Sequence, residues 1–349
     1  MLTAAQLHTA AGPAVPATLL TSRGSMTVEQ VDAGETQQST IDRGRAETRP
    51  REAPAQTHRR TTALPLKCVY PAGSTLMAIR ALLLRAYWRM EAVIAPGVRH
   101  SQLLYEDVVN AHAAPARTRL DLGCGRYLMP PWRHVDDATS FTSAKQLVGI
   151  DPDFRALAEN RAVPLRCQGL TTDLPFASAT FDLVTANMVL EHLQDPVVEF
   201  REVSRVMKTG GVFVFHTPNA RGYPTVLARL IPDGAKKRLV GILEGRPSEE
   251  VYPAYYRANT PEALAALARA SGMELIDLRL TISTASTAAI LPAALIELLV
   301  MRLLKRKRFE SLRTTIIGVM QKKPVRVAAG SDAGGGHYTS IHADASVAP

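Results

Sequence analysis

Cysteine is scarce in this sequence, and its scarcity excludes a disulfide-stabilised fold. The 349 residues contain three cysteines, Cys68, Cys124 and Cys167. They are too few and too scattered for a disulfide framework, and no two of them form a Cys-x-x-Cys pair. The sequence therefore predicts a protein of the reducing cytoplasm, and we expect no metal site.

We expect neither a secretory leader nor a membrane span. Residues 1–20 lack a basic start and a continuous apolar core, and Pro13 and Pro16 interrupt them. The long apolar stretch at 288–304 reaches only about 17 residues, the lower limit for a span. Glu297 and Arg302 within it would be costly at the centre of a bilayer. We therefore expect the chain to remain inside the cell.

Positive charge, in contrast, is abundant and unevenly placed. The net charge is +9, and basic residues gather at 43–60, 80–89 and 302–308. Two interpretations stay open: these residues form an ordinary solvated surface, or they face a nucleic acid or an anionic membrane. The charge alone does not decide between them.

The composition changes along the chain and divides it into three parts. Residues 1–66 are rich in Ala, Thr, Pro, Gln and Arg without an apolar period, which predicts a disordered extension. Residues 75–325 carry the periodic apolar patterns of a folded domain, which begins with an amphipathic basic helix at 75–94. Residues 326–349 are rich in Gly and Ser and predict a flexible tail.

Within the folded part, short apolar strands alternate with helices. Strands are expected at 118–122, 146–150, 164–168, 181–186, 211–216, 274–280 and 314–320. One helix is expected from Asp195-Pro196 to Gly210-Gly211, and another at 260–271. This alternation predicts an α/β fold, with a parallel sheet, right-handed crossovers and helices on both faces.

The most informative stretch is Leu120–Arg126, which reads Leu-Asp-Leu-Gly-Cys-Gly-Arg. Gly123 and Gly125 follow a short strand directly, and glycine allows both a sharp turn and the close approach of a ligand to the main chain. The next strand ends in Asp151. A strand, a glycine turn and an acid after the next strand are typical of a parallel sheet that holds an adenosine-type cofactor.

Further motifs extend this pattern in a fixed order. They are Asp-Leu-Gly-Cys-Gly (121–125), Gly-Ile-Asp (149–151), Asp-Leu-Pro-Phe (173–176), Phe-Asp-Leu-Val (181–184), Leu-Glu-His-Leu (190–193) and Lys-Thr-Gly-Gly (208–211). In this order they resemble the class I S-adenosylmethionine-dependent methyltransferases, and 202–219 resembles their ubiquinone-biosynthesis-type branch (methyltransferase type 11). The run Tyr-Tyr-Arg-Ala-Asn-Thr-Pro (255–261) is similar to bacterial methyltransferases of undefined substrate.

The resemblance covers about residues 75–325 and implies both a fold and a cofactor. The fold is a Rossmann-like, seven-stranded, mostly parallel sheet with an antiparallel last strand, an N-terminal helix and a C-terminal cap. The cofactor is S-adenosylmethionine, whose ribose hydroxyls Asp151 would bind. The other implied contacts are Asp121 near the ammonium group or ordering the loop, Gly123, Cys124 and Gly125 beside the methionine part, Pro152 after the acid, Leu170 and Thr171 beside adenine, and Asn187 on the methionine side.

The sequence departs from the family pattern at two positions. The usual third glycine is missing, and Leu128 stands at its place. The acid often found after Gly169 is replaced by Leu170, which removes a side-chain hydrogen bond to adenine. These departures leave the fit of the cofactor loop to be tested.

Two histidines are candidates for general-base catalysis. Methyl transfer from a sulfonium depends mostly on proximity and orientation, so only an acceptor hydroxyl of high pKa needs a base. His192 and His216 lie near the carboxyl ends of predicted strands, where ligands bind in open α/β sheets. The alternative for each is a histidine satisfied within the fold.

A cap over the acceptor is expected at about residues 220–260. Tyr255, Tyr256 and Arg257 belong to it, and Arg257 could bind an anionic acceptor. Core packing is the alternative account of the tyrosines. By resemblance, the acceptor is a small molecule or a lipid- or sugar-linked compound, methylated at oxygen.

Three rival functions were weighed against this one. A nicotinamide-dependent oxidoreductase would need glycine where Leu128 stands. A nucleic-acid methyltransferase would carry an Asn/Asp-Pro-Pro-aromatic run where 187–189 reads Asn-Met-Val. A non-catalytic, membrane-associated scaffold that keeps the fold and binds the cofactor weakly or not at all stays open.

The segment 287–308 combines an apolar helix with the basic run Lys-Arg-Lys-Arg at 305–308. This combination predicts an interfacial helix that meets anionic lipid, so we expect a cytoplasmic protein with a peripheral contact to the inner face of the membrane. The alternative is a helix packed on the sheet or on a dimer partner. The sequence predicts no oligomeric state.

Overall fold

The computed structural model of the chain describes residues 6–10, 27–31, 75–113, 115–130, 146–230, 252–283 and 290–324. Several predictions therefore lie outside the described residues. They are the flexible tail at 326–349, the middle of the cap at 231–251, and most of the extension at 1–66.

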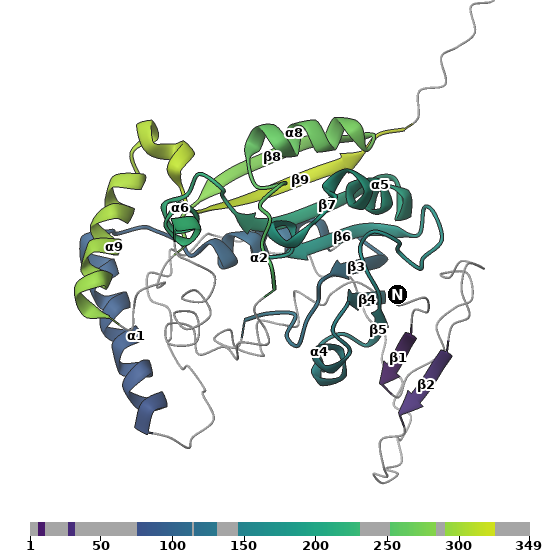
Figure 1. Cartoon of the computed structure of the whole chain (residues 1–349), viewed down its shortest axis with the longest axis horizontal. Helices are drawn as coiled ribbons and strands as arrows, with labels where there is room; N and C mark the ends of the chain where they lie inside the picture. Colours follow the sequence, from purple (N-terminus) through teal and green to yellow (C-terminus); the bar gives the residue numbers. More distant parts are fainter. Residues whose placement is uncertain are drawn as a thin grey trace, which may run out of the picture.

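A single sheet organises the fold, with the strand order β2-β1-β5-β4-β3-β6-β7-β9-β8 (Figure 1). Its parallel centre consists of β3 (Thr118–Leu122), β4 (Gln146–Asp151), β5 (Leu165–Gln168), β6 (Phe181–Asn187) and β7 (Met207–Pro218). Strand β9 (Thr315–Lys322) runs antiparallel between β7 and β8 (Met273–Thr281). From β5 to β8 this is the predicted seven-stranded sheet, and the fold prediction is confirmed.

The strand order also marks the place of a ligand site. The chain passes from β3 to β4 on one side, and later returns to lay β6 on the other side of β3. The carboxyl ends of β3 and β6 therefore border a topological switch point, where open α/β sheets bind their ligands. The glycine turn follows β3 at this edge.

Two short strands extend the sheet beyond the prediction. β1 (Gln6–Ala10) pairs antiparallel with β5, and β2 (Thr27–Val31) pairs parallel with β1. Both lie in the segment 1–66, for which disorder was expected, so these strands differ from that expectation. A physical reason is the open edge of β5, whose unpaired backbone groups can accept a further strand.

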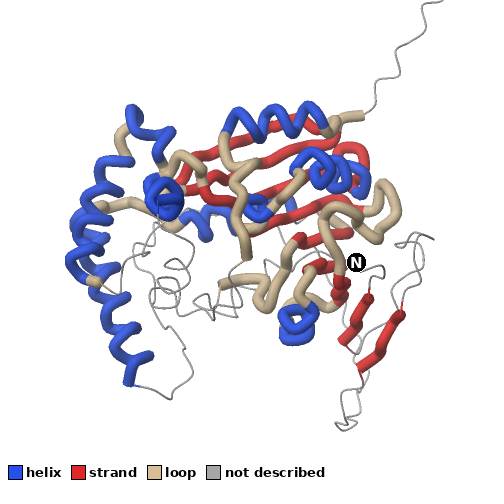
Figure 2. Tube along the Cα trace, in the orientation of Figure 1, coloured by secondary structure: helices blue, strands red, loops and turns tan. Residues whose placement is uncertain are grey.

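Helices cover both faces of the sheet, as the blue and red segments of Figure 2 show. On one face lie α5 (Pro196–Val206) and α8 (Pro261–Ala270), and the Phe200 ring of α5 meets the Phe213 ring of β7 edge to face. On the other face lie α2 (Ser101–Ala113) and α4 (Phe154–Glu159). Asp195 caps α5 as predicted, because its carboxylate accepts from the Val198 N–H.

Three helical elements differ from the sequence prediction. Helix α5 ends at Val206, before the predicted stop at Gly210-Gly211, because Met207 is buried and already pairs with Phe181 at the start of β7. Helices α2 and α6 (Tyr223–Leu230) were not predicted. The apolar period of α2 is weak because its buried face also contains polar side chains.

A helical lobe stands apart from the sheet. It consists of α1 (Thr75–Ile94), α9 (Leu291–Leu304) and the 3₁₀ turn η4 (Lys307–Leu312), and it has an apolar cluster of its own. Asn219, directly after β7, fixes the lobe to the sheet by donating to the Ser311 and Arg313 carbonyls at 2.9 and 2.7 Å. Among the described residues, no helix is long and apolar enough to cross a membrane.

Candidate functional site

The glycine turn after β3 has the conformation that the sequence predicts. Gly123 and Gly125 have positive φ angles of 61° and 49°, which residues with a side chain rarely adopt. A Cβ atom on Gly123 would also lie 2.6 Å from a methyl carbon of Val189. The turn thus brings the main chain close to the loop after β6, where only glycine fits.

Asp151 holds this turn in place. Its Oδ2 accepts from the Gly125 N–H at 2.8 Å, and its Oδ1 accepts from the Asp153 N–H at 2.8 Å. Burial raises the pKa of Asp151, and these two N–H donors oppose that rise. Each oxygen keeps a further lone pair, so a ribose diol fits the carboxylate chemically.

Asn160 is a part of this site that the sequence reading missed. It is fully buried, and its amide Nδ2 donates to the carbonyls of Cys124 and Gly125 at 3.0 and 2.9 Å. The Cys124 side chain is buried against Gly149, so only the backbone of this predicted contact can face a ligand. Leu128, at the place of the missing third glycine, packs in the apolar cluster behind the turn. A single asparagine after a short helix gives no sequence signal of this role.

Asp121 is engaged inside the fold. Its Oδ1 accepts a hydrogen bond from the Thr185 hydroxyl and an ion-paired bond from Arg119 at 3.4 Å. Arg119 has no exposed surface. Burial raises the pKa of Asp121, and Arg119 and Thr185 lower it. The geometry favours the second of its two predicted roles, which is to order the loop.

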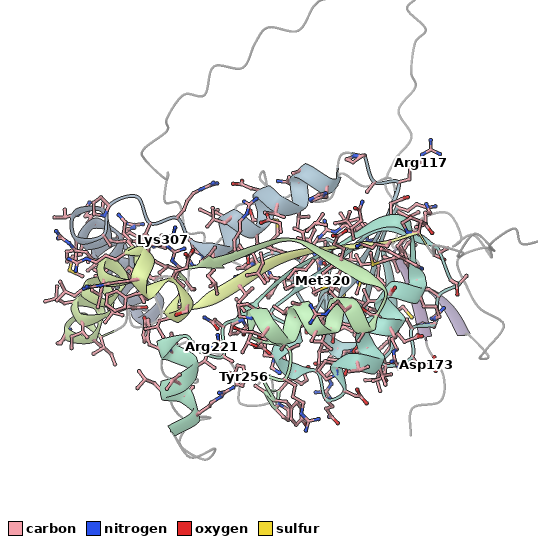
Figure 3. All side chains as sticks on the ribbon, turned by 90° about the horizontal axis from the view of Figure 1, so that it is seen from above. Arg117, Asp173, Arg221, Tyr256, Lys307 and Met320 are labelled. Atoms are coloured by element: carbon pink, nitrogen blue, oxygen red, sulfur yellow. The ribbon has the colours of Figure 1, made fainter. Side chains whose placement is uncertain are left out.

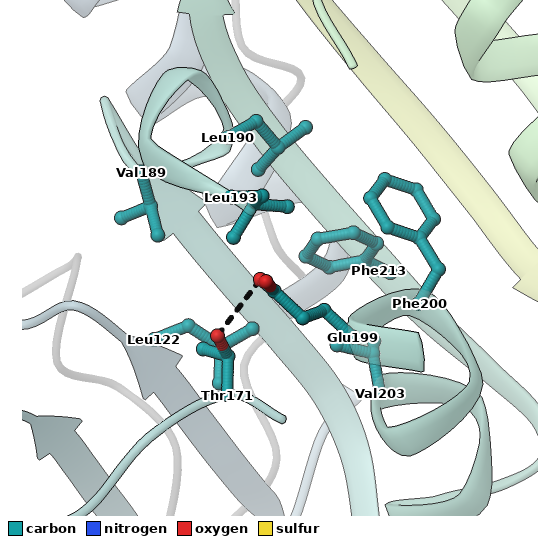
Figure 4. A pocket seen from close by; sticks show the side chains of 9 residues that line it. All are labelled: Leu122, Thr171, Val189, Leu190, Leu193, Glu199, Phe200, Val203 and Phe213. Carbon is teal, nitrogen blue, oxygen red and sulfur yellow. Dashed lines mark hydrogen bonds between the residues drawn. The ribbon is translucent and has the colours of Figure 1, made fainter. Parts of the chain in front are cut away.

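Of the two residues expected beside adenine, Thr171 lines a small apolar pocket (Figure 4), and Leu170 does not. Leu170 is 53% exposed and free to contact a ligand with its side chain. The Thr171 hydroxyl instead donates to Glu199 Oε2 at 2.9 Å, so its side chain is held toward α5. Pro152 is exposed, and its carbonyl accepts from Gln168. The pocket is lined by Leu122, Thr171, Val189, Leu190, Leu193, Glu199, Phe200, Val203 and Phe213.

A chain of polar side chains joins α2 to the ends of β6 and β7. Asn187 Oδ1 lies 2.9 Å from His216 Nδ1, and Asn187 Nδ2 donates to Gln102 Oε1 at 3.1 Å. Gln102 in turn donates to Glu106 at 3.1 Å. The sequence predicted Asn187 and His216 for this site but not Gln102, because helix α2 itself was missed.

His216 is a neutral, buried histidine. Its ring stacks on Tyr105 with centroids 5.5 Å apart and is 1% exposed. Burial, with a smaller effect of His100, lowers the pKa of His216 to about 3. Because Asn187 Oδ1 accepts the proton on Nδ1, Nε2 carries the lone pair, and among the described residues Nε2 has no hydrogen-bond partner.

His192 has a different setting at the edge of the site. Its Nδ1 lies 2.7 Å from the Pro253 carbonyl, which fixes the proton on Nδ1 and leaves the lone pair on Nε2. Its side chain is 34% exposed, and its ring meets the ring of Tyr252 edge-on. The Tyr252 hydroxyl donates to Asp153 Oδ2 at 3.2 Å. Tyr252, which the sequence reading missed, thus bridges from the His192 side to the Asp151 side.

The predicted cap residues dock on the 3₁₀ turn η2 (Leu190–His192). The Tyr255 and Tyr256 N–H groups donate to the Glu191 carbonyl at 2.7 and 3.1 Å. The Arg257 guanidinium donates to the Gln194 carbonyl and lies over the Tyr255 ring. These contacts bring the three residues to the site, but they give Arg257 a partner within the fold.

The described site residues gather at one edge of the sheet. Backbone N–H groups and the Asp151 carboxylate converge at the ends of β3 and β4. The two histidines lie at the end of β7 and in η2 after β6, with His192 Nε2 at 3.9 Å from Glu191 Oε1. In the part of the chain that the structure describes, no cluster of His, Cys, Asp or Glu could hold a metal ion.

Comparisons with known proteins agree with this arrangement. The methyltransferase domain family matches residues 120–215. A demethylmenaquinone methyltransferase of Corynebacterium urealyticum is 38% identical over 172 residues, which are 45% of this chain and 72% of that protein. A malonyl-[acyl-carrier protein] O-methyltransferase of Legionella pneumophila is 35% identical over 121 residues, 33% of this chain and 40% of that protein.

The chain spans less than half of the length of several curated relatives that it matches. Among solved structures, a methyltransferase of Bacillus halodurans described as putative is 19% identical, with a TM-score of 0.40. The match covers 64% of this chain and all of that one.

Proposed function

The chain belongs to the class I S-adenosylmethionine-dependent methyltransferases, and we propose that it transfers the methyl group to an oxygen of a small-molecule, lipid-linked or sugar-linked acceptor. The observation that carries this proposal is the Asp151 carboxylate, held by the N–H groups of Gly125 and Asp153 at 2.8 Å each. It stands beside a glycine turn at the switch point of the sheet, ready to accept two ribose hydroxyls.

We propose a partner among the described residues for each part of the methyl donor. Asp151 would bind the ribose, the backbone at Gly123–Gly125 would approach the methionine part, and Leu170 would cover adenine. When bound, S-adenosylmethionine supplies a methyl group already activated by its sulfonium. The protein then contributes mainly proximity and orientation.

We assign the general base to His192. The Pro253 carbonyl holds the proton on Nδ1, so Nε2 can take the proton of an acceptor hydroxyl as the oxygen attacks the methyl carbon. The exposure of His192 leaves room for an acceptor. His216 is the weaker candidate, because a pKa near 3 makes its imidazole a poor proton acceptor at neutral pH. We propose that His216 positions Asn187 and the end of β6.

Oxygen as the methylated atom is supported by the Legionella relative, which is an O-methyltransferase. The setting of His192 points the same way, because a base is needed only when the nucleophile is a hydroxyl of high pKa. The acceptor class is a proposal that rests on the cap around Tyr252 and Tyr255, whose rings offer an apolar, hydrogen-bonding surface.

Two measurements on the full chain test this function. Calorimetric titration with S-adenosylmethionine should give saturable binding, and the absence of heat at millimolar ligand would refute the enzyme proposal. Incubation of the protein with methyl-labelled donor and fractionated metabolite and lipid extracts should yield a product that mass spectrometry shows to be methylated at oxygen.

A pair of histidine variants tests the assignment of the base. His192→Gln should keep donor binding and lose transfer, while His112→Gln on α2 should keep both. A His192→Gln protein with wild-type turnover would show that no general base acts at this position.

A further inference from the structure

Helix α9 is apolar on both sides. Its inner side packs in the core of the helical lobe, with Leu298 and Met301 fully buried. Its outer side exposes Leu295 (46%), Ile296 (64%), Leu299 (53%) and Leu303 (39%). At 100° per residue these four side chains fall on one continuous face of the helix. A helix that is apolar all round is ordinarily buried, so we expect the outer face of α9 to pack against another surface.

The exposed charges of α9 and of the run 305–308 that follows it are all basic. After α9 come Lys305, Arg306, Lys307 and Arg308, all exposed, and Arg302 is exposed within the helix. The neighbouring helix α1 exposes Arg85 and Arg89 on its outward side. The acids of the two helices, Glu91 and Glu297, are partly or fully buried between them. Within 82–94 and 292–308, every exposed charged residue is therefore basic.

The lobe lies at the functional edge of the sheet. The start of β9, which follows η4 directly, pairs with the end of β7 at Pro218 and Thr315. The lobe is thus joined to the carboxyl ends of the parallel strands, the edge where Asp151 and His216 lie. Figures 1 and 3 place it at one end of the molecule, with Lys307 far from Asp173 at the other end.

We infer that the outer face of α9, with the basic run 305–308, docks on the surface of an anionic lipid bilayer. The exposed leucines and Ile296 would enter the boundary between headgroups and acyl chains, and the cations would meet lipid phosphates. The contact is peripheral. It presents the carboxyl-end edge of the sheet to the membrane surface, and, given the proposed function, it selects an acceptor carried in or on that surface.

The main alternative is that a second copy of the chain packs on the outer face of α9, and the charge pattern disfavours this dimer. In a two-fold dimer through α9, the same patch would face itself, so the basic runs of both copies would crowd around one apolar seam. Like charges at close range are destabilising. A surface of phosphate headgroups neutralises those charges instead, and this complementarity selects the bilayer.

Vesicle flotation of the full-length protein tests the inference. One vesicle set contains phosphatidylcholine alone, and the other also contains phosphatidylglycerol. The wild type should float with the anionic vesicles, float weakly with the neutral ones, and be released by salt. Ile296→Glu combined with Leu299→Glu should reduce partitioning by more than about tenfold. Arg306→Glu combined with Lys307→Glu should reduce it by more than about 30-fold, because the loss of each cation costs about fivefold and the new carboxylates are repelled by the anionic lipid.

Matched controls make the same kinds of substitution at exposed positions elsewhere. Val197→Glu replaces an exposed valine of α5, and Arg269→Glu reverses an exposed charge on α8. Both should float like the wild type. Calorimetric titration with S-adenosylmethionine is repeated on every variant. A variant that still binds the donor has a folded sheet, so its loss of flotation is a failure of docking and not of the proposed function.

Three outcomes would overturn the inference. The first is a wild-type protein that binds S-adenosylmethionine but does not float with anionic vesicles. The second is flotation that the Ile296 and Leu299 double variant leaves unchanged. The third is a dimer, seen by sedimentation, that this variant converts to a monomer in the absence of lipid, because the face would then join two copies of the chain.

Discussion

Replacing Asp151 with Asn is the sharpest test of the site, because the two side chains have the same shape. In the wild type both carboxylate oxygens accept backbone N–H bonds, from Gly125 and from Asp153, at 2.8 Å each. An amide has one oxygen and one NH₂ group. Whichever way Asn turns, its NH₂ group faces one of these N–H donors, and one backbone donor loses its acceptor.

The structure gives a magnitude for donor binding and for stability. A hydrogen bond to a charged group is worth about 1.5–3 kcal/mol, and the variant loses one such bond to the ribose and weakens the other. We therefore expect S-adenosylmethionine to bind at least about 30-fold more weakly, which corresponds to about 2 kcal/mol. The unpaired N–H of Gly125 or Asp153 should also lower the free energy of unfolding by about 1–3 kcal/mol.

Calorimetric titration and urea unfolding measure the two effects separately. Because burial raises the pKa of Asp151, affinity of the wild type should fall on acidification sooner than for a solvent-exposed aspartate, and the variant should lack this fall. Asp195→Asn is the matched control, since it caps α5 by accepting from Val198 and Asn caps equally well. A loss of less than about threefold in affinity would refute the ribose role of Asp151.

Three further predictions concern the fold around the site. Glu91→Gln should raise the melting temperature, and most strongly above neutral pH. Burial and Glu297 raise the pKa of Glu91 from 4.5 to about 7. The stability that the protonated Glu91 contributes is therefore complete below pH 4.5 and is lost as the pH rises through about 7. Gly318→Ala should lower the free energy of unfolding by about 1–3 kcal/mol in a urea titration. The Cβ atom of an alanine at position 318 would lie 2.2 Å from the Phe215 ring. Arg119→Met should cost about 3–5 kcal/mol in the same titration, because it leaves Asp121 buried without its ion partner.

For each of these predictions there is a control variant or a result that would contradict it. For Glu91, a variant whose melting temperature tracks the wild type at every pH would contradict the raised pKa. For Gly318, the exposed Gly272 is unsuitable as a control because its φ is positive, so Thr172→Ala, at an exposed loop position, serves instead. For Arg119, an unchanged urea midpoint would show that Asp121 is not held as an ion.

The sequence predicted what depends on short-range patterns. The strand 118–122, the glycine turn and Asp151 follow from neighbouring residues, and the structure places the turn and the acid in contact at 2.8 Å. Helix 75–94 has the predicted bounds, because its apolar spacing is regular over its whole length. The antiparallel last strand came from the resemblance, and the pairing of β9 with β7 confirms it.

What the sequence did not predict depends on contacts between distant segments. Asn160 acts on the glycine turn from 35 residues away, and Gln102 reaches Asn187 from 85 residues away. Neither residue belongs to a motif, since one amide among many carries no pattern. Helix α2 was missed for a related reason: Gln102 and Glu106 lie on its buried side, where a period analysis expects apolar residues.

Two residues at the edge of the sheet have strained backbone conformations. Met188 and Tyr256 adopt positive φ angles of 56° and 54°, a conformation that costs about 1–2 kcal/mol for a residue with a side chain. Each is held by an acceptor on another element: the Met188 N–H donates to the His216 carbonyl of β7 at 2.8 Å, and the Tyr256 N–H donates to the Glu191 carbonyl of η2. β7 and η2 therefore hold both strained residues beside the elements that carry His216 and His192. Local motifs predicted Asp151 and the two histidines as candidates, but they could not predict these contacts, because each contact joins segments that are far apart in the sequence.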